Sequence, residues 1–360
     1  MYVHHHISSR NRLRRTAVSG ALVCFVLAAV TAISACGSSA AGHASADVKL
    51  GYFPNVTHAP ALVGVAEGYF SKELGTAASL HTFTFASGTE AIEAVLSGAL
   101  DMSFIGPNPA ITAFAQSKGA AIRIVSGSTS GGAFLVVKPG ITSAEQLRGT
   151  TLATPALGNT QDVALRSWLK DNGLETTKEG GGDVAILPQK NASTLEAFVA
   201  GDIDGAWVPE PWATQLINQG GGTVLVDERD LWPETNGRYV TTHLIVRTDF
   251  LNAHPDVVKA VIAGLADSID FIATDPATAQ ADVIAQIAAI SGKAPKADVI
   301  ATSFDHLVFT LDPIAASLAA SAADATSVGL LDPVDLTGIY DLTFVNQILA
   351  ARGQAEVNGL

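Results

Sequence analysis

The sequence predicts an α/β fold built from two units in series, each a mostly parallel sheet flanked by helices. From Val48 onward, short apolar runs alternate with segments whose apolar residues recur every three or four positions. This alternation of strand and helix patterns is typical of parallel sheets. The 325 residues that follow the N-terminal segment described below exceed the size at which one core keeps growing, so two domains are expected.

The first unit is expected to contain four strands with helices between them. The strands are predicted at Val48 to Phe53, His81 to Ala86, Asp101 to Ile105 and Ile122 to Ser126. The helices are predicted at Pro60 to Phe70, Thr89 to Ser97 and Pro109 to Lys118. Each helix segment has its apolar residues on one face, which would cover the sheet.

The second unit repeats this pattern after Gly132. Strands are predicted at Phe134 to Val137, Thr151 to Ala153, Val184 to Leu187, Asp204 to Val208 and Thr223 to Val226. Helices are predicted at Thr160 to Asn172, Ala192 to Ala200 and Pro211 to Gln219.

The pattern changes after Thr241. One more strand is predicted at Thr242 to Val246, followed by alanine-rich helices at Pro255 to Ala273, at Pro276 to Ile290 and beyond. These helices have no sheet of their own, so we expect them to pack on the first unit. The chain would then form lobe 1 from residues 48–132 with 241–360, and lobe 2 from residues 133–240. Two crossings, near 131–137 and 241–246, would make a hinged cleft.

The N-terminal 35 residues are typical of a bacterial export signal. Four arginines, at positions 10, 12, 14 and 15, precede an apolar stretch from Ala17 to Ala32. This stretch is followed by Ile33, Ser34, Ala35 and Cys36. The stretch is shorter than the ~20 residues that span a membrane, which disfavours a transmembrane anchor. Residues 1–35 are therefore interpreted as a lipoprotein signal peptide, Cys36 as the lipidated residue that carries the palmitate of a membrane anchor, and residues 36–47 as a flexible tether.

Charge and cysteine content exclude several classes of function. The formal net charge is −13, and it falls to −17 when the four arginines of the signal are removed. So acidic a protein is not expected to bind nucleic acid or anionic lipid. Cys24 lies in the signal, so only Cys36 remains, which excludes a disulfide, a thiol nucleophile and a cysteine metal site.

Polar residues follow several predicted strands at their carboxyl ends, where open α/β sheets bind ligands. Ser87, Gly88, Thr89 and Glu90 have the spacing of a capping box, Gly106 and Asn108 precede Pro109, and Asn159, Thr160 and Gln161 begin the next helix. Each junction alone is better interpreted as an ordinary helix cap, which stabilises by ~1 kcal/mol. Their recurrence predicts that three helix starts converge on one cleft.

Further candidates lie at three other places along the chain. The first strand is followed by Asn55, Thr57 and His58, the exit from the first unit holds Ser128 and Thr129, and Glu210 and Trp212 follow the strand that ends at Val208. Capping, a plain flexible connection and core packing remain alternatives for these groups. A Glu210 that faced the cleft would favour a cationic group on the ligand.

The chemistry of these candidates indicates binding of an anion. They offer N–H and O–H donors, and no Lys or Arg is among them. Such a set suits a small oxyanion held by hydrogen bonds and helix dipoles, each bond to a charged group contributing ~1.5 to 3 kcal/mol.

The sequence gives no indication of catalysis. It has no GxSxG, HExxH, phosphate-loop or GxGxxG pattern before a helix, and its histidines lack the spacing of metal ligands. Single glycosylation patterns at Asn55 and Asn191 carry no weight. We expect a monomer that is not an enzyme and that binds no metal and no cofactor.

The chain resembles the substrate-binding proteins of ABC importers for aliphatic sulfonates, taurine and nitrate. The similarity runs from Val48 to Leu360 and is most distinctive at residues 51–64, 88–109, 147–169 and 204–212, above all in the string from Thr154 to Arg166. The resemblance implies a type II periplasmic-binding-protein fold, closure of two lobes on the solute, and delivery to a membrane permease and its ATPase.

The resemblance also implies a ligand site on particular residues. The family's ligand loops fall on Asn55, Thr57, His58, Ser87, Gly88, Thr89, Gly106, Asn108, Ser128, Thr129, Asn159, Thr160, Gln161, Glu210 and Trp212. The last loop departs from the aspartate-proline form that is more usual in the family, which leaves the organic end of the substrate open.

The leading hypothesis is a lipid-anchored solute-binding protein that captures a small oxyanion, above all a sulfonate, on the outer face of the cell membrane. One alternative is uptake of a neutral heterocycle, such as a thiamine-pyrimidine precursor, stacked on Trp212 or Tyr52. A second is a lyase or synthase on the same fold that uses His58 and Glu210 as acid and base. A third is a surface sensor or adhesin without a permease.

Overall fold

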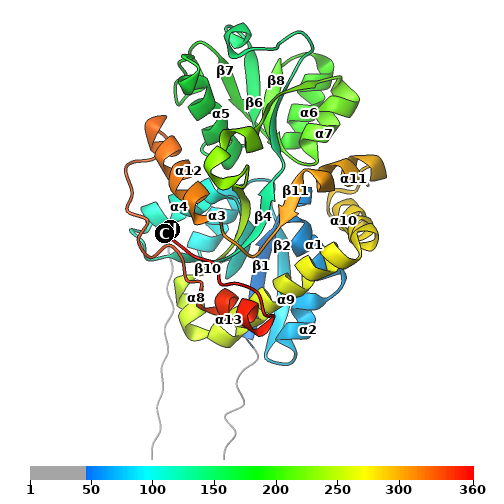
Figure 1. Ribbon diagram of the computed structural model, residues 1–360, viewed down its shortest axis with the longest axis vertical. Coiled ribbons are helices and arrows are strands. Elements are labelled where there is room, and N and C mark those ends of the chain that lie inside the picture. The colour runs from blue at the N-terminus through cyan, green and yellow to red at the C-terminus, as the bar shows by residue number, and fades with distance from the viewer. Residues whose placement is uncertain (1–45) are drawn as a thin grey trace, which may run out of the picture. The chain divides into compact units, whose positions relative to one another are not determined.

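The structure is a computed structural model that describes residues 46–360 (Figure 1). The predicted signal peptide, Cys36 and most of the predicted tether lie outside the described residues. The tether prediction is wrong at its end, because Ala46 and Asp47 already belong to the first strand.

The strands form two sheets. Sheet A has the order β11-β4-β10-β3-β1-β2 and sheet B the order β7-β6-β8-β5-β9. The strands of sheet A are β1 (Ala46–Tyr52), β2 (Ala78–Thr84), β3 (Met102–Ile105), β4 (Ile122–Gly131), β10 (Val240–Arg247) and β11 (Leu307–Phe309). Those of sheet B are β5 (Ala133–Val137), β6 (Thr151–Thr154), β7 (Ala185–Pro188), β8 (Gly205–Pro209) and β9 (Thr223–Asp227).

Both sheets are mixed, with most strands running in one direction. In sheet A, β1 pairs in parallel with β2 and β3, whereas β10 runs antiparallel to β3 and β4, and β11 antiparallel to β4. In sheet B, β6 pairs in parallel with β7 and β8, and β5 runs antiparallel to β8 and β9. The reversed strands β10 and β5 adjoin the points where the chain passes between the sheets.

Helices cover the faces of both sheets (Figure 1). The helices are α1 (Ala59–Ala66), α2 (Tyr69–Leu74), α3 (Gly88–Leu96), α4 (Pro107–Gln116), α5 (Thr160–Asp171), α6 (Asn191–Ala200), α7 (Trp212–Gly220), α8 (Thr248–Ala253), α9 (Pro255–Thr274), α10 (Pro276–Ser291), α11 (Ala297–Asp305), α12 (Ala315–Ser327) and α13 (Thr343–Ala351). Short 3-10 turns are η1 (Val56–His58), η2 (Ala144–Leu147), η3 (Glu228–Leu231) and η4 (Pro233–Thr235). Among the residues described, no helix combines the length and the apolar character that crossing a membrane requires.

Each sheet has a hydrophobic cluster on either face. Helix α9 shows why: its fully buried residues Val258, Val261, Ile262 and Leu265 recur at spacings of three and four, so they form one apolar stripe. This stripe packs with Leu50 of β1 in the cluster on one face of sheet A. The expectation that the late helices pack on the first unit is met for α9, α10 and α13, which share this cluster.

Helices α11 and α12 also contact the sheet B side of the molecule. Ser303 of α11 donates a hydrogen bond to Glu210, which follows β8, and Ser167 of α5 donates one to Asp324 of α12. These two helices therefore connect elements of both sheets, which the sequence alone did not indicate.

Several predicted boundaries are wrong. The predicted helix from Pro60 to Phe70 is two helices, because Gly68 adopts a positive φ of 74° between them. Strand β2 begins at Ala78 and ends at Thr84, whereas it was predicted at His81 to Ala86, and its largely exposed side chains explain the weak sequence signal. Strand β11 was not predicted.

Candidate functional site

A small cavity lies between elements of the two sheets. Its volume is about 30 Å³, which is room for about two water molecules or a group of a few heavy atoms. Its walls are formed by Phe53, Asn55, Thr57, His58, Ala86, Ser87, Gly106, Pro155, Asn159, Thr160, Gln161, Asn191, Pro209 and Thr241. Of these described lining residues, none is an Asp, Glu, Lys or Arg.

The starts of α3, α4 and α5 converge on this cavity, as the sequence predicted. Ser87 contributes from α3, Gly106 from α4, and Asn159 with Thr160 and Gln161 from α5. The positive ends of three helix dipoles and their first-turn N–H groups are thus directed at one small volume.

The start of α5 is held by a buried ion pair. Asp162 accepts hydrogen bonds from Thr154 Oγ1 at 2.8 Å, from the backbone N–H of Gly158 at 2.9 Å and from Arg166 Nε at 3.0 Å. Asp162 therefore fixes the loop that leads into α5 and does not cap the first N–H groups of the helix, and the side chain of Asn159 makes no capping bond either. The side chains of Asn159, Thr160 and Gln161 all line the cavity.

Helix α3 begins with a cap at Ser87, in agreement with the prediction. Ser87 Oγ accepts a hydrogen bond from the backbone N–H of Glu90 at 3.4 Å and lies 3.0 Å from Thr89 Oγ1. Ser87 lines the cavity, whereas Gly88 and Thr89 do not. Gly88 has a different role, because a Cβ there would lie 2.9 Å from Asn159 Oδ1 and so would crowd the start of α5.

Helix α4 begins two residues earlier than predicted. Gly106 is the N-cap and Pro107 the first helical residue, so Asn108 is neither the cap nor part of the lining. Asn108 Nδ2 instead donates to the carbonyl oxygen of Ser321 on α12, at 3.1 Å. A Cβ on Gly106 would lie 2.5 Å from Thr160 Oγ1, so the absence of a side chain lets α5 approach α4 closely.

His58 is a buried, neutral hydrogen-bond donor to the cavity. Its side chain is 2% exposed, and burial lowers its pKa from 6.5 to about 3. Its Nδ1 accepts a hydrogen bond from the backbone N–H of Phe53 at 3.4 Å, so the proton of the neutral ring sits on Nε2. Asn55 and Thr57 line the cavity beside it.

Trp212 connects the two sides of the cavity without lining it. Its Nε1 donates to Asn55 Oδ1 at 2.9 Å, and Asn55 belongs to the loop that follows β1. Trp212 therefore acts on the cavity through Asn55.

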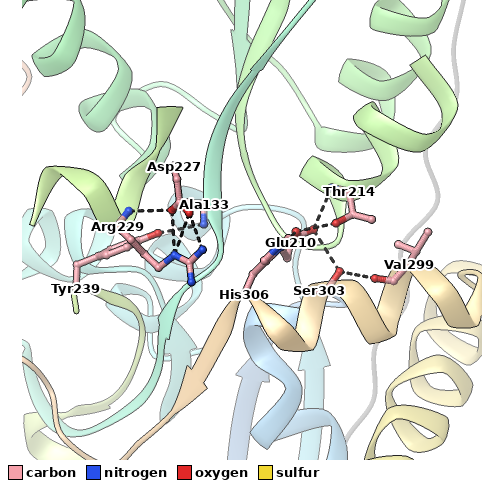
Figure 2. Close-up of polar contacts among 9 residues, drawn as sticks. All are labelled: Ala133, Glu210, Thr214, Asp227, Arg229, Tyr239, Val299, Ser303 and His306. Carbon is pink, nitrogen blue, oxygen red and sulfur yellow. Dashed lines mark hydrogen bonds and ion pairs between the residues drawn. The ribbon is translucent and has the colours of Figure 1, made fainter. Parts of the chain in front are cut away.

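Glu210 does not line the cavity, and Figure 2 shows its side chain among Thr214, Ser303 and His306. Its fully buried carboxylate accepts bonds from the backbone N–H and Oγ1 of Thr214, at 3.1 and 2.8 Å, and from Ser303 Oγ at 3.2 Å. His306 Nδ1 lies 2.6 Å from Oε1, the carboxylate oxygen that also accepts from Thr214 Oγ1. The carboxylate is therefore fully engaged by these partners. A cleft-facing Glu210 would have favoured a cationic group on the ligand, but the described lining holds no carboxylate that could pair with one.

Ser128 and Thr129 lie on β4 and are also absent from the lining. Both are buried, and their hydroxyl groups have no hydrogen-bond partner among the residues the structure describes. Their role in ligand binding stays a prediction.

Sequence reasoning missed part of the lining. Asn191 begins α6 directly after β7, at the same carboxyl edge as the predicted loops, but it was considered only as part of a glycosylation pattern. Thr241 lies at the start of β10, and its Oγ1 donates to the carbonyl oxygen of Gly131 at 2.6 Å, linking the two crossings. The other missed lining residues are Phe53, Ala86, Pro155 and Pro209.

Among the described residues, no group of three His, Cys, Asp or Glu side chains is placed to hold an ion. The hydroxyl and amide groups of the cavity are hydrogen-bond donors and acceptors with no strong base beside them. The arrangement is suited to binding a ligand.

Comparison with known proteins gives consistent results. The model of the NMT1-like family matches residues 41–289. The taurine-binding periplasmic protein of Escherichia coli (strain K12) is 30% identical over 244 residues, which cover 67% of this chain and 72% of that protein.

Solved structures show the same fold. The periplasmic nitrate-binding protein NrtA from Synechocystis PCC 6803 superimposes with a TM-score of 0.72 at 16% identity, covering 86% of this chain and 89% of that one. The alkanesulfonate-binding protein SsuA from Xanthomonas axonopodis pv. citri, bound to MOPS, gives a TM-score of 0.66 at 20% identity and covers 80% of this chain and 95% of its own. The predicted fold class is confirmed.

Proposed function

The chain belongs to the NMT1-like family, and from this premise we propose that it is the solute-binding protein of an ABC importer for a small oxyanion. The proposed ligand is an aliphatic sulfonate, taurine or nitrate, and the proposed site is the cavity between the two lobes. The sulfonate class is preferred because the 30% identical relative is a taurine-binding protein.

The observation that carries the proposal is the cavity itself. It collects three helix starts and a neutral histidine, and none of the described lining residues carries a charge at neutral pH. An oxyanion in this cavity would be held by N–H and O–H donors. About four such bonds at ~1.5 to 3 kcal/mol each suffice for micromolar binding, which requires about −8 kcal/mol.

The roles of the residues follow from their positions. His58 Nε2, the hydroxyls of Thr57, Ser87 and Thr160, and the amides of Asn159 and Gln161 are the proposed donors to the anion. Asn55, held by Trp212, and Gly106 shape the wall. Glu210 is assigned no contact with the ligand, so an amino group on the substrate is not required for recognition.

The proposal includes the location and the partners of the protein. Lipidation at Cys36 would hold it on the extracytoplasmic face of the membrane, where a permease and its ATPase would receive the solute. This assignment rests on the N-terminal sequence and on the periplasmic location stated for relatives such as the taurine-binding protein. The protein is proposed to act as a monomer and not as an enzyme.

The first prediction tests the ligand class by thermal unfolding of the purified full-length protein. Ethanesulfonate, taurine and nitrate are compared with a neutral aminopyrimidine as control. We expect at least one anion to raise the midpoint, because a ligand at 100 times its dissociation constant adds ~2.7 kcal/mol. A shift with the aminopyrimidine and with none of the anions would contradict the anion proposal and would support heterocycle uptake instead.

A further inference from the structure

We propose that the first turn of α6, from Asn191 to Thr194, forms an additional wall of the anion site, and that Asn191 selects for an oxyanion. This inference rests on the proposed function and extends it to a helix that no motif indicated. It concerns the charged head group of the ligand, not its organic end.

The first observation is the position of Asn191. It lines the cavity together with Thr160, yet only 7% of its surface is exposed. Its Oδ1 has no hydrogen-bond partner among the described residues. Thr194 lies one turn further along the same face of the helix and is 1% exposed. Its Oγ1 also has no partner among the described residues. A buried polar group without a partner destabilises the empty protein, and a ligand that supplies the partner would remove that penalty.

The second observation concerns the lining atoms that are themselves buried: among these, the atoms without a partner lie on one side. On the side of sheet A, Ser87 Oγ, Asn55 Oδ1 and His58 Nδ1 all have protein partners. On the side of sheet B, Thr160 Oγ1 and Asn191 Oδ1 have none among the described residues. The buried lining atoms that a ligand could pair with thus lie at the starts of α5 and α6.

The third observation is the backbone of α6. The first helical hydrogen bond runs from the N–H of Thr194 to the carbonyl oxygen of Lys190, at 2.9 Å, so the N–H groups of residues 191 to 193 precede the helical ladder. Lys190, the N-cap residue, makes no side-chain cap. Free donors and the positive end of the helix dipole favour a negative group here.

These observations determine which end of the Asn191 amide meets the ligand. A carbonyl oxygen directed at an anion would be repelled, whereas the Nδ2 group can donate to an oxygen of a sulfonate or nitrate. The two ends of an amide exchange by a half-turn of the side chain. The anion would then bridge the first turns of α5 and α6.

The test compares Asn191→Asp and Asn191→Leu with wild-type full-length protein by calorimetric titration of ethanesulfonate, taurine and nitrate. Asn191→Asp keeps the shape of the side chain and places a negative charge beside the bound anion. The affinity for the anion is therefore expected to fall more than ~100-fold. Asn191→Leu removes the donor without adding charge and is expected to cost ~10- to 100-fold. Val199→Asp, at the exposed C-terminal end of the same helix and outside its first turn, is the matched control and should bind within about 3-fold of wild type.

The outcomes separate the two proposals. Failure of the wild type to bind any of the three anions overturns the proposed function and with it this inference. Normal binding by both Asn191 variants, or a ratio of taurine to ethanesulfonate affinity in Asn191→Asp that exceeds the wild-type ratio, leaves the proposed function intact and overturns the inference. If Asn191→Asp does not fold, as judged by its unfolding transition without ligand, Asn191→Leu decides alone.

Discussion

At the scale of single residues, the structure buries carboxylates in two different ways. Asp162 is fully buried against Arg166, so its charge is paired. Glu228 is buried without a cation, and its hydrogen bond from Trp207 Nε1 at 2.8 Å only partly offsets desolvation. Burial raises the pKa of Glu228 from 4.5 to about 7. Glu228 is therefore the carboxylate whose protonation is coupled to folding near neutral pH.

Replacement of Glu228 by glutamine should change the pH dependence of stability. The folded state holds the Glu228 proton more tightly than the unfolded state, so the wild type loses stability as pH rises from about 4.5 through 7. Glu228→Gln cannot ionise and keeps an acceptor for Trp207. We expect the variant to be more stable than wild type at pH 8, by up to about 3 kcal/mol, and nearly equal at pH 4.5. Urea unfolding at both pH values measures this, and an identical difference at the two would contradict it.

At the scale of elements, the site depends on how closely α4 and α5 approach each other. Gly106 faces Thr160 Oγ1 at a distance that leaves no room for a Cβ, and the carbonyl oxygen of Thr241 lies beyond it. The two helix starts can point at one cavity only because this position has no side chain.

Gly106→Ala is therefore expected to weaken ligand binding. Overpacking of this kind costs about 1 to 3 kcal/mol, which corresponds to roughly 5- to 150-fold in affinity if the helix starts separate to relieve the clash. Gly181→Ala is the matched control, since a Cβ there would meet only Thr177 Oγ1 at 3.6 Å. Calorimetric titration with the anion that the wild type binds measures both variants, and unchanged binding by Gly106→Ala would refute the close-approach argument.

Most elements could be predicted from the sequence, because caps and turns lie between regular apolar patterns. The starts of α3 at Gly88 and of α5 at Thr160 were placed within one residue and correctly, respectively. Strand β11 was missed because its three residues are defined by pairing with β4, far away in the chain, and not by a local pattern. Asn191 was missed because Lys190 gives α6 no recognisable cap.

The direction of Glu210 shows the limit of such prediction for the site. The sequence places it correctly at the carboxyl end of β8 but cannot say which way the side chain turns. Its partners Ser303 and His306 are 93 and 96 residues away in the sequence. Their contact with Glu210 therefore depends on the packing of α11, which no local pattern predicts.

At the scale of the whole molecule, the contacts in Figure 2 gather where the chain passes between the sheets. Tyr239, which precedes β10, accepts a hydrogen bond at its hydroxyl from the backbone N–H of Ala133, the first residue of β5. Nearby, the backbone N–H of Glu210 donates to the carbonyl oxygen of Gly132 at 2.8 Å. The two crossings and α11 are thus tied together beside the cavity and not within it.

Glu210→Gln should accordingly affect stability without changing selectivity. The variant loses the charge-assisted contact with His306 and weakens the bonds from Thr214 and Ser303, which we expect to cost about 1 to 3 kcal/mol of unfolding free energy. The ratio of taurine to ethanesulfonate affinity should remain that of the wild type, because Glu210 does not line the cavity. Chemical unfolding measures the loss of stability, and calorimetric titration measures the affinity ratio. A changed ratio of taurine to ethanesulfonate affinity would show that Glu210 contributes to ligand selection.

The uncharged lining of the cavity has a consequence for the kinetics of capture. The chain carries a net charge of −13, and no cation in the described lining offsets it locally, so an approaching anion meets a repulsive field until it reaches the helix starts. The hydrogen-bond donors of the cavity then determine the dissociation rate of the anion. Added salt would screen the repulsion and speed association, while leaving dissociation from the enclosed, neutral walls almost unchanged.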